Sequence, residues 1–285
     1  MEFTPLTDEQ RRSFDRDGFL VVPGALPEDL LRRLEAACDR LYSEGRTAEG
    51  LNDRGFWQMR NCLPRDDAFV ELLDCPATVP LVVQLLSHNV QLITSHLVVR
   101  PPNADGPGGD RKVSGWHRDG GTSPSDLGLA QPRMFIKIAY WLSDLSEPGR
   151  GAIRLLPGSN DTSMPRPDGD ADGEHLEIRA RPGDAVLFEN RTLHAVGDNY
   201  SAITRKSVFF GYGYRWLRPM DYASHSDELL ARCDPIRRQL LGDSSGPMGF
   251  QLPEQGEVPL REWLAEHTGE VVSARAETPG VFATR

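Results

Sequence analysis

The stretch AVLFENRTLHAVGDNYSAITRKSVFFGYGYRW, residues 185–216, decides the fold that the sequence predicts. It contains two runs of β-branched, aromatic and other apolar residues, 185–189 and 203–216, with turn-forming Asn, Gly and Asp between them. This pattern is typical of short β-strands. Many short strands joined by turns predict a β-barrel or a double-sheet jelly roll. Further runs of the same kind precede the stretch, at 19–22, 90–100, 134–142, 152–159 and 176–180.

The segment before residue 90 has mainly helical patterns. A capping box over Thr7–Gln10 begins a short helix. A second helix begins near Pro27 and keeps an apolar stripe at helical spacing. We expect a third helix over 67–86, interrupted near Pro76 and Pro80. These helices should pack on one face of the sheet.

The domain organisation follows from this division. We expect a mainly β protein with flanking helices, folded as one domain over residues 1–285. The tail mixes helical patterns with Gly/Ser stretches, and its role is not evident from the sequence. The expected parts are an N-terminal helical and strand support over 1–89, a jelly-roll core with the functional site over 90–218, and a C-terminal extension over 219–285.

Composition and charge limit what the chain can do. Hydrophobic residues make up 39% and charged residues 26%, which is ordinary for a soluble globular protein. A net charge of −10 argues against a nucleic-acid-binding face, which needs clustered basic residues. We find neither a leader pattern nor an apolar run of membrane-spanning length, so we expect no signal peptide and no membrane segment. The four cysteines are scattered, which favours reduced thiols in a cytoplasmic protein.

A His-x-Asp pair lies at the start of the predicted core. Residues two apart in an extended segment face the same way, so His117 and Asp119 project together while Arg118 points away. His194, just after the predicted strand 185–189, can supply a third ligand from a neighbouring strand. Two imidazoles and a carboxylate on one face of a metal leave three positions open, as in the facial triad of non-haem Fe(II) oxygenases. His-x-Asp alone occurs often by chance; the combination with a distal histidine carries the prediction.

A basic residue follows the distal histidine. Arg205 and Ser207 share one face of their predicted strand, where a guanidinium and a hydroxyl can bind a carboxylate. A dicarboxylate such as 2-oxoglutarate chelates a metal through its 2-oxo acid end and needs an anchor for its far carboxylate. Taken alone, Arg205 would more often form a surface salt bridge. Its place after a distal histidine predicts a carboxylate-binding residue.

Several segments around these residues resemble the phytanoyl-CoA hydroxylase (PhyH-like) family of Fe(II)/2-oxoglutarate-dependent dioxygenases. The resemblance covers about residues 6–218 and implies a double-stranded β-helix (jelly-roll, cupin-like) core. It implies an oxidoreductase that uses Fe(II), 2-oxoglutarate and O₂, with His117, Asp119 and His194 as catalytic iron ligands and Arg205 as the anchor. The segments are FDRDGFLVVPGALPEDLLRRLEAACD, WHRDGG, YWLSDLSEPGRGAIRLLPGSN and RPGDAVLFENRTLHAVGDNYSAITRKSV.

Two further basic residues are candidates for binding 2-oxoglutarate. Arg100 ends the strand before a Gly/Pro-rich loop and matches a position where members of the family often contact this co-substrate. Lys137 lies in the middle of its predicted strand, on one face with Phe135 and Trp141. A solvated outer face is the alternative explanation for this lysine.

The carboxylate of Asp119 bears on the type of reaction. Halogenating relatives have Gly or Ala at this position, so Asp119 favours hydroxylation of an unactivated C–H bond, with release of succinate and CO₂. Desaturation, epimerisation and ring closure use the same cofactor chemistry and remain alternatives. Two readings from other classes also remain: a non-catalytic jelly-roll binding protein, and a cupin-like metalloenzyme that would not need Arg205.

The substrate is expected to be a small molecule, by analogy a bacterial natural product or its precursor. We expect no nucleic-acid or membrane partner, and either a monomer or a homodimer. Both tryptophans among the substrate candidates could instead belong to the core. The candidates for the substrate pocket are His96, Trp116, Trp57, Arg118, the stretch RGFWQMRN at 54–61 and the loop 101–112 as a lid.

Overall fold

The protein is described by a computed structural model over residues 1–52, 55–103, 115–119, 131–165, 175–243 and 258–269. No helix in these ranges is both long enough and apolar enough to cross a membrane. The strands are β1 (Phe19–Val22), β2 (Trp57–Arg60), β3 (Val90–Arg100), β4 (Phe135–Trp141), β5 (Ile153–Leu155), β6 (Leu176–Ile178), β7 (Ala185–Glu189), β8 (His194–Val196) and β9 (Arg205–Tyr214). The helices are α1 (Asp8–Asp17), α2 (Glu28–Glu49), the 3₁₀ helix η1 (Leu63–Arg65), α3 (Asp67–Leu72), α4 (Val79–Leu85), α6 (Asp227–Ala231), α7 (Pro235–Leu240) and α8 (Pro259–Thr268).

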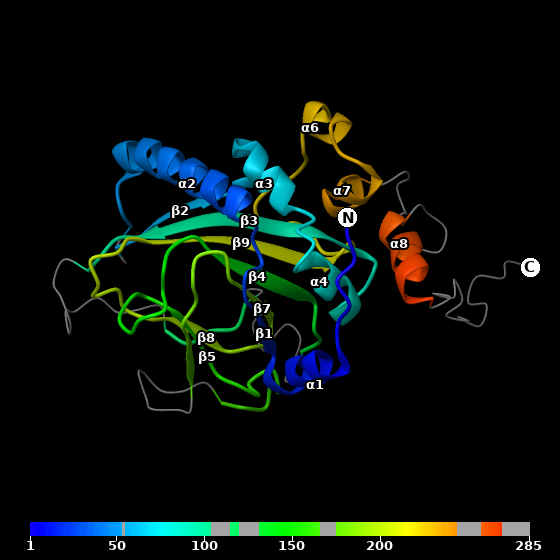
Figure 1. The fold of residues 1–285 in the computed structure, drawn as a ribbon, viewed down its shortest axis with the longest axis horizontal. Coiled ribbons are helices and arrows are strands. Elements are labelled where there is room, and N and C mark those ends of the chain that lie inside the picture. The colour runs from blue at the N-terminus through cyan, green and yellow to red at the C-terminus, as the bar shows by residue number, and fades with distance from the viewer. Residues whose placement is uncertain (53–54, 104–114, 120–130, 166–174, 244–257, 270–285) are drawn as a thin grey trace, which may run out of the picture.

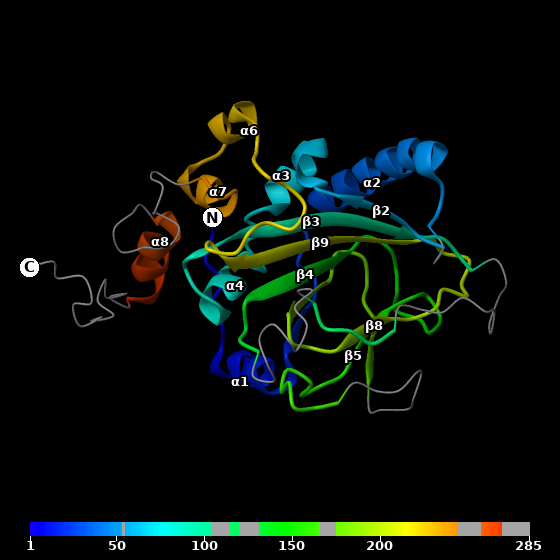
Figure 2. The same cartoon turned by 180° about the vertical axis from the view of Figure 1, so that it is seen from behind.

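The strands form two sheets that pack against each other. The larger sheet has the order β1-β7-β4-β9-β3-β2 and the smaller one β6-β5-β8, and all pairs of neighbouring strands are antiparallel. Side chains from both sheets meet in one buried cluster, with Trp141 and Phe188 from the larger sheet and Ile153 and Leu155 from the smaller. Strands β5 and β8 lie below the larger sheet in Figure 1 and in the reverse view of Figure 2. This arrangement confirms the predicted jelly roll.

Most of the observed strands follow the apolar runs of the sequence. β1, β3 and β7 have the predicted bounds, and β4, β5, β6 and β9 are shorter than the runs that predict them. The pattern does not predict β2 and β8, which have four and three residues. Alternation over so few residues gives too weak a signal. Both of these short strands border the candidate site described below.

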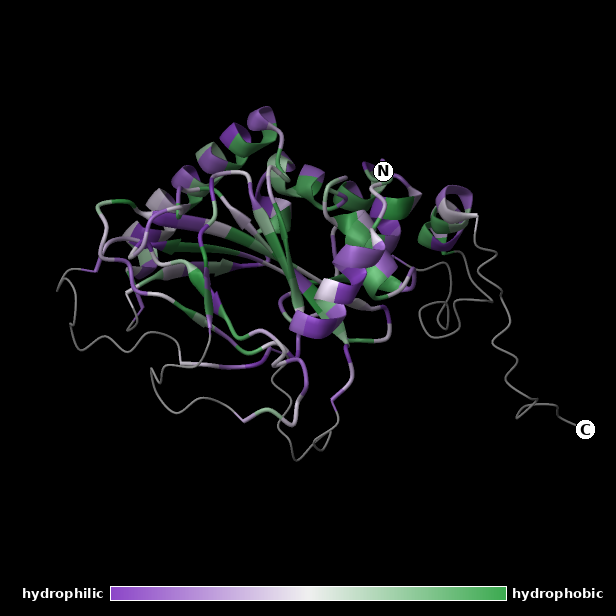
Figure 3. Cartoon of the chain, turned by 60° about the horizontal axis from the view of Figure 1, so that its bottom comes forward, coloured by the Kyte–Doolittle hydropathy of each residue, from purple (hydrophilic) through white to green (hydrophobic). Residues whose placement is uncertain are grey.

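Helices cover the outer face of the larger sheet. α2 and α3 lie along this face, above β2 and β3 (Figure 1). The buried residues of α2 include Leu30, Leu34 and Leu41, which belong to the stripe expected from the sequence. Figure 3 shows hydrophobic residues concentrated on the strands, while the helices carry both hydrophobic and hydrophilic residues. Burying each such leucine contributes roughly 1.5–3 kcal/mol to packing the helix on the sheet.

The expected helical segment 67–86 is interrupted near Pro76, as predicted, but not at Pro80. α3 ends at Leu72 and α4 begins at Val79, with Pro76 in the break between them. Pro80 does not interrupt a helix, because it lies in the first turn of α4, where an N–H would have no intrahelical partner. The segment therefore forms two short helices in place of one long one.

Gly18 joins α1 to β1 and contacts the loop that carries the distal histidine. It ends α1 with a positive φ of 83°. A Cβ atom on Gly18 would lie 2.2 Å from Oγ1 of Thr192, and the Thr192 hydroxyl donates a 2.8 Å hydrogen bond to the Gly18 carbonyl. Only glycine permits both the backbone angle and this close approach. The contact fixes the loop two residues before His194.

Candidate active site

A cavity of about 230 Å³ lies between the two sheets. Its wall combines apolar side chains with a larger number of convergent polar and charged groups, so it offers both apolar surface and charge to a small molecule. The apolar residues are Phe56, Val98, Ile153, Phe188, Val196 and Phe209. The polar residues are Gln58, Arg60, His96, Arg100, His117, Asp119, Lys137, His194 and Arg205.

Three candidate metal ligands converge in this cavity. Two backbone hydrogen bonds of 3.0 Å pair His117 with His194, so the short segment 115–119 lies beside β8. The N–H of Asp119 donates to the carbonyl of Asn190 at 3.1 Å. The candidate ligand atoms of the two histidines and Asp119 all lie within 4.8 Å of one another. The fold thus brings together the three residues that the sequence predicts as ligands, at a spacing that one ion can bridge.

Backbone carbonyls orient both imidazoles. Nδ1 of His117 lies 3.0 Å from the carbonyl of Gly115, and Nδ1 of His194 lies 3.0 Å from that of Thr192. A carbonyl only accepts, so each Nδ1 is assigned the proton and each Nε2 keeps its lone pair. Burial lowers the pKa of His194 to about 4, although the Asp119 carboxylate opposes this shift. At neutral pH the imidazole is uncharged, as metal ligation requires.

Lys137 forms an ion pair with the candidate carboxylate ligand. Its Nζ lies 2.7 Å from Oδ2 of Asp119, and both side chains are largely buried. Burial alone would raise the pKa of Asp119, but the Lys137 ammonium and the two imidazoles hold it well below its usual range. The carboxylate is therefore ionised and suited to a cation. Lys137 lies inside the cavity, and not on a solvated outer face of its strand.

Arg205 is a buried cation in the cavity wall. Its side chain is 1% exposed, and its guanidinium carbon lies 4.9 Å from the ring centroid of Trp141. The pairing of β3 with β9 places Arg100 directly opposite. Burial, followed by the charge of Arg100, lowers the pKa of Arg205 to about 9, so the group is still charged at neutral pH.

Among the residues that the structure describes, Arg205 has no counter-charge. Within the described parts of the chain, its Nε has no hydrogen-bond partner and no carboxylate forms an ion pair with it. A buried charge is costly unless an opposite charge compensates it. The residues present therefore fit an anion bound at this end of the cavity.

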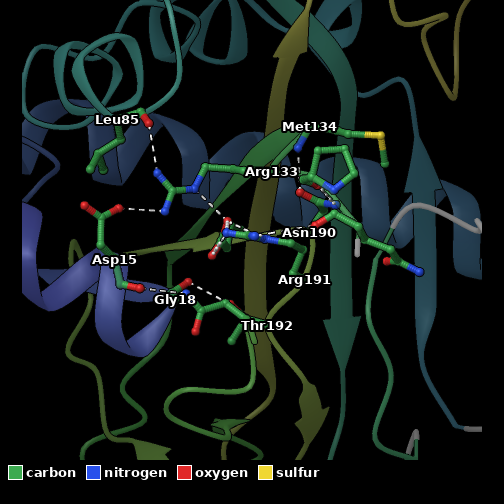
Figure 4. A network of polar contacts seen from close by, with 12 residues as sticks. Asp15, Gly18, Leu85, Arg133, Met134, Asn190, Arg191 and Thr192 are labelled. Atoms are coloured by element: carbon green, nitrogen blue, oxygen red, sulfur yellow. Dashed lines mark hydrogen bonds and ion pairs between the residues drawn. The ribbon is translucent and has the colours of Figure 1, made fainter. Parts of the chain in front are cut away.

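A second buried group of charges holds the loop between β7 and β8 (Figure 4). Glu189 is fully buried and accepts from Arg133 at 2.6 Å and from Arg191 at 2.8 Å. Arg133 also contacts Asp15 of α1 at 2.7 Å. We call these four residues the Glu189 network. The loop that it fixes includes Asn190, whose carbonyl accepts from the N–H of a candidate ligand.

Three predicted substrate residues lie outside the cavity wall, which corrects their assignment. Trp57 packs in the core against Tyr42 of α2, with ring centroids 5.7 Å apart, because alternation along β2 turns it away from the cavity. Trp116 is buried in a small cluster that includes Leu193. Arg118 donates to three backbone carbonyls at 2.7, 2.9 and 3.1 Å, so it holds loops together.

The cavity-wall residues that the sequence analysis does not name are apolar: Val98, Ile153, Phe188, Val196 and Phe209. A second group was named only as part of a longer stretch. Phe56, Gln58 and Arg60 line the cavity and belong to the stretch 54–61 that was expected to approach the substrate. The pairing of β2 with β3 places Arg60 opposite His96. Side chains alternate between the two faces of a strand, so a strand at 57–60 places Gln58 and Arg60 toward the cavity and Trp57 toward the core.

The other predicted residues have different positions. His96 lines the cavity, and its ring stacks on Phe209 with centroids 4.9 Å apart. Ser207 is buried, and its hydroxyl lies 3.5 Å from the carbonyl of Val98, but it does not form part of the cavity wall. The predicted lid at 101–112 lies outside the described residues from 104 onward.

Comparison with known proteins extends this picture. The phytanoyl-CoA dioxygenase (PhyH) family model matches residues 14–207, which include all three candidate ligands and Arg205. Peroxisomal phytanoyl-CoA dioxygenase of Mus musculus is 21% identical over 259 residues, which cover 80% of this chain and 74% of that protein. Dioxygenase cdmD of Talaromyces verruculosus is 28% identical over 137 residues, and that match spans 46% of this chain but only 44% of the relative's length.

Solved structures share the fold. HygX from Streptomyces hygroscopicus, crystallised with nickel and 2-oxoglutarate, has a TM-score of 0.62 at 18% identity, over 79% of this chain and 94% of that one. SnoK, described as a non-haem α-ketoglutarate-dependent carbocyclase from nogalamycin biosynthesis, has a TM-score of 0.59 at 19% identity, over 81% and 92%. At such identities the likeness establishes the architecture, and the chemistry has to be argued from the site.

Proposed function

The chain belongs to the phytanoyl-CoA dioxygenase family of Fe(II)/2-oxoglutarate-dependent oxidoreductases, and from this premise we propose that it hydroxylates an unactivated C–H bond of a small molecule. The observation that carries the proposal is the convergence of two imidazoles, a carboxylate and a buried guanidinium in one cavity. Succinate and CO₂ would be the co-products.

Each group in the cavity has a role in this proposal. His117 and His194 would hold Fe(II) through Nε2, and Asp119 through a carboxylate oxygen. When bound, the iron, together with 2-oxoglutarate and O₂, supplies the oxidising power for C–H cleavage. Arg205 would bind the far carboxylate of 2-oxoglutarate, and Arg100 would add positive charge beside it. This assignment is supported by the uncompensated charge of Arg205 and by the cross-strand position of Arg100.

Lys137 and the apolar wall would prepare the site. The Lys137 ammonium keeps Asp119 ionised before the metal binds and is placed to attract an anionic co-substrate. Phe188 and Phe209 present apolar surface to the cavity, which limits the water that can enter. Dry surroundings strengthen the charge interactions that hold the co-substrate.

A second outcome of the same cofactor chemistry is ring closure or another oxidation without a new hydroxyl group. The observation that favours it is the fold shared with SnoK, which is described as a carbocyclase. A natural product as substrate is supported by HygX, whose structure has also been described with hygromycin B bound. Once a substrate is found, the mass and structure of its product distinguish hydroxylation from ring closure, desaturation and epimerisation.

The test of the cofactor assignment is an anaerobic titration of the metal-free protein with Fe(II) and 2-oxoglutarate. A 2-oxo acid that chelates ferrous iron gives a weak visible metal-to-ligand charge-transfer band. We expect the band in the parent protein and its absence in Asp119→Ala. In Arg205→Ala we expect it only at far higher 2-oxoglutarate concentrations, about 100-fold or more, because a buried charge pair is lost.

Lys206→Ala is the matched control. Lys206 is the next residue of β9, and its Nζ lies 2.5 Å from Asp39, outside the cavity wall. Removing this cation should leave the titration unchanged. A folded, iron-loaded parent protein without the band would overturn the proposed function.

A further inference from the structure

A chain of hydrogen bonds joins the cavity to the segment that follows β9. The hydroxyl of Thr94 donates to Oδ2 of Asp221 at 2.8 Å. Nδ1 of His96 lies 3.4 Å from the same hydroxyl oxygen. We call these three residues the Asp221 relay. It ends on a histidine in the cavity wall that neither the candidate metal site nor the Arg205 site uses.

The relay is firmly held at its outer end. Oδ2 of Asp221 also accepts from the backbone N–H of Ser95 at 3.0 Å and from that of Asn61 at 3.4 Å. Thr94 is fully buried. A Cβ atom on Gly211 of β9 would lie 2.7 Å from the Thr94 methyl group, so a glycine there makes room for the threonine. The hydrogen bond to Asp221 and the contact of the methyl group with Gly211 therefore hold the Thr94 side chain in one orientation.

The direction of the hydrogen bonds decides the tautomer of His96. A carboxylate only accepts, so the single hydroxyl hydrogen of Thr94 points to Asp221. The Thr94 oxygen is then the acceptor toward His96, which places the imidazole proton on Nδ1. Nε2 is left as a hydrogen-bond acceptor. A histidine is commonly fixed in one tautomer by the partner of its other nitrogen.

The charges around His96 restrict what it can accept. Burial, followed by the cations Lys137 and Arg60, lowers the pKa of His96 well below its usual range, so the ring is neutral. The Asp119 carboxylate opposes this shift but is paired with Lys137, so Arg60 leaves a net positive charge that disfavours an ammonium group. Phe209 covers one face of the ring, with an interplanar angle of 7°. The donor that fits an uncharged acceptor in these surroundings is an uncharged O–H group.

We infer that the substrate presents a neutral hydroxyl group to Nε2 of His96, and that Asp221, acting through Thr94, is the positioning residue that keeps this nitrogen an acceptor. The inference rests on the proposed function, because it names the class of molecule, an alcohol with an apolar body, that the cavity takes as substrate. It also assigns a role to the first residues of the C-terminal extension.

The tautomer can be measured without turnover. In protein with ¹⁵N-labelled histidine, loaded with Zn(II) and 2-oxoglutarate, long-range ¹H–¹⁵N correlation spectra show which ring nitrogen carries the proton, and His96→Gln identifies the signals. We expect protonated Nδ1 in the parent and in Thr94→Ser, and a shift of the proton to Nε2 in Thr94→Val. His117 and His194 serve as internal controls. Protonated Nε2 in the parent, or no change in Thr94→Val, would overturn the inference.

The class of ligand is tested on the same samples with two probes of one skeleton, cyclohexylmethanol and cyclohexylmethylamine. We expect the alcohol to shift the His96 ring signals and to bind about tenfold more weakly to Thr94→Val, since one hydrogen bond is lost. The amine should bind more weakly than the alcohol. Equal binding of both probes, or an alcohol that leaves His96 unchanged, contradicts the assignment. Because neither readout depends on iron, failure here is distinct from failure of the charge-transfer titration.

Discussion

The Glu189 network and the Arg205 site each centre on a buried charge, and they differ in whether the described chain supplies the counter-charge. In the network, Glu189 lies between Arg133 and Arg191, and the chain itself completes the set. At the Arg205 site, Arg100 lies opposite on the neighbouring strand, and within the described parts of the chain no carboxylate forms an ion pair with Arg205. We therefore propose that a bound anion supplies the counter-charge of Arg205.

This difference separates charges that hold the fold from charges that bind. A complete buried ion pair contributes little net stability. Removing one member leaves a buried charge without compensation, which lowers the free energy of unfolding. A buried cation without a partner lowers the stability of the empty protein and favours anion binding by the same interaction. Mutation of the central residue at each site is therefore expected to have opposite effects: loss of stability at Glu189, and loss of anion binding without loss of stability at Arg205.

The largest effect is expected from Glu189→Gln. It leaves Arg133 and Arg191 without their shared carboxylate, and we expect the free energy of unfolding to fall by about 3–5 kcal/mol. Urea denaturation measures it. The control is Asp29→Asn, because Asp29 pairs with Arg32 and Arg33 on the exposed surface of α2, where loss should cost about 1 kcal/mol or less. Similar losses in both variants would remove the distinction drawn here.

A smaller effect, and one of a different kind, is expected from Arg205→Met. The ligand-free variant should be at least as stable as the parent, since an uncompensated charge is removed. In Zn(II)-loaded parent protein, 2-oxoglutarate at 100 times its Kd should add about 2.7 kcal/mol of stability, and in the variant close to none. Thermal unfolding with and without 2-oxoglutarate gives both numbers. A variant that unfolds more easily when empty would show that Arg205 holds the fold after all.

A third effect concerns the pH dependence of stability and the buried His194 of the metal-free protein. The pKa of His194 is lowered to about 4 in the folded protein, whereas an unfolded histidine titrates near 6.5. Between these pH values the unfolded chain binds the extra proton, so stability falls as the pH is lowered from about 6.5 to 4. The contribution is on the order of 3 kcal/mol. Urea denaturation at several pH values in this range measures the free energy of unfolding. We expect it to depend less on pH in His194→Gln than in the parent protein, and an equal pH dependence in both would contradict the assignment.

Much of the fold could be predicted because long apolar runs leave little choice. The run at 90–100 is rich in β-branched and apolar residues, and it forms β3 with the same bounds. The segment 67–86 was harder, because a proline can either break a helix or begin one, and Pro76 and Pro80 differ in this respect. Which of the two a proline does depends on where the neighbouring turns pack.

The candidate ligands could be predicted because their chemistry demands particular residue types. An imidazole, a carboxylate two residues later and a distal imidazole are recognisable wherever they stand in the chain. The aromatic and aliphatic residues of the cavity wall cannot be recognised in this way, because the same residue types also form the core. Trp57 was expected near the substrate and is in the core, while its neighbours Phe56 and Gln58 line the cavity. A one-residue difference along a strand reverses the face.

By itself, the sequence determined the strand-rich core, the order of the candidate ligands and the basic residue behind them, because these follow from local pattern and from the chemistry of single side chains. Only the tertiary structure decided which residues share the cavity. β2 pairs with β3, Arg100 lies opposite Arg205, and Asp221 reaches Thr94 from far along the chain. Such contacts depend on register and on sheet packing between distant segments, and no local pattern encodes them.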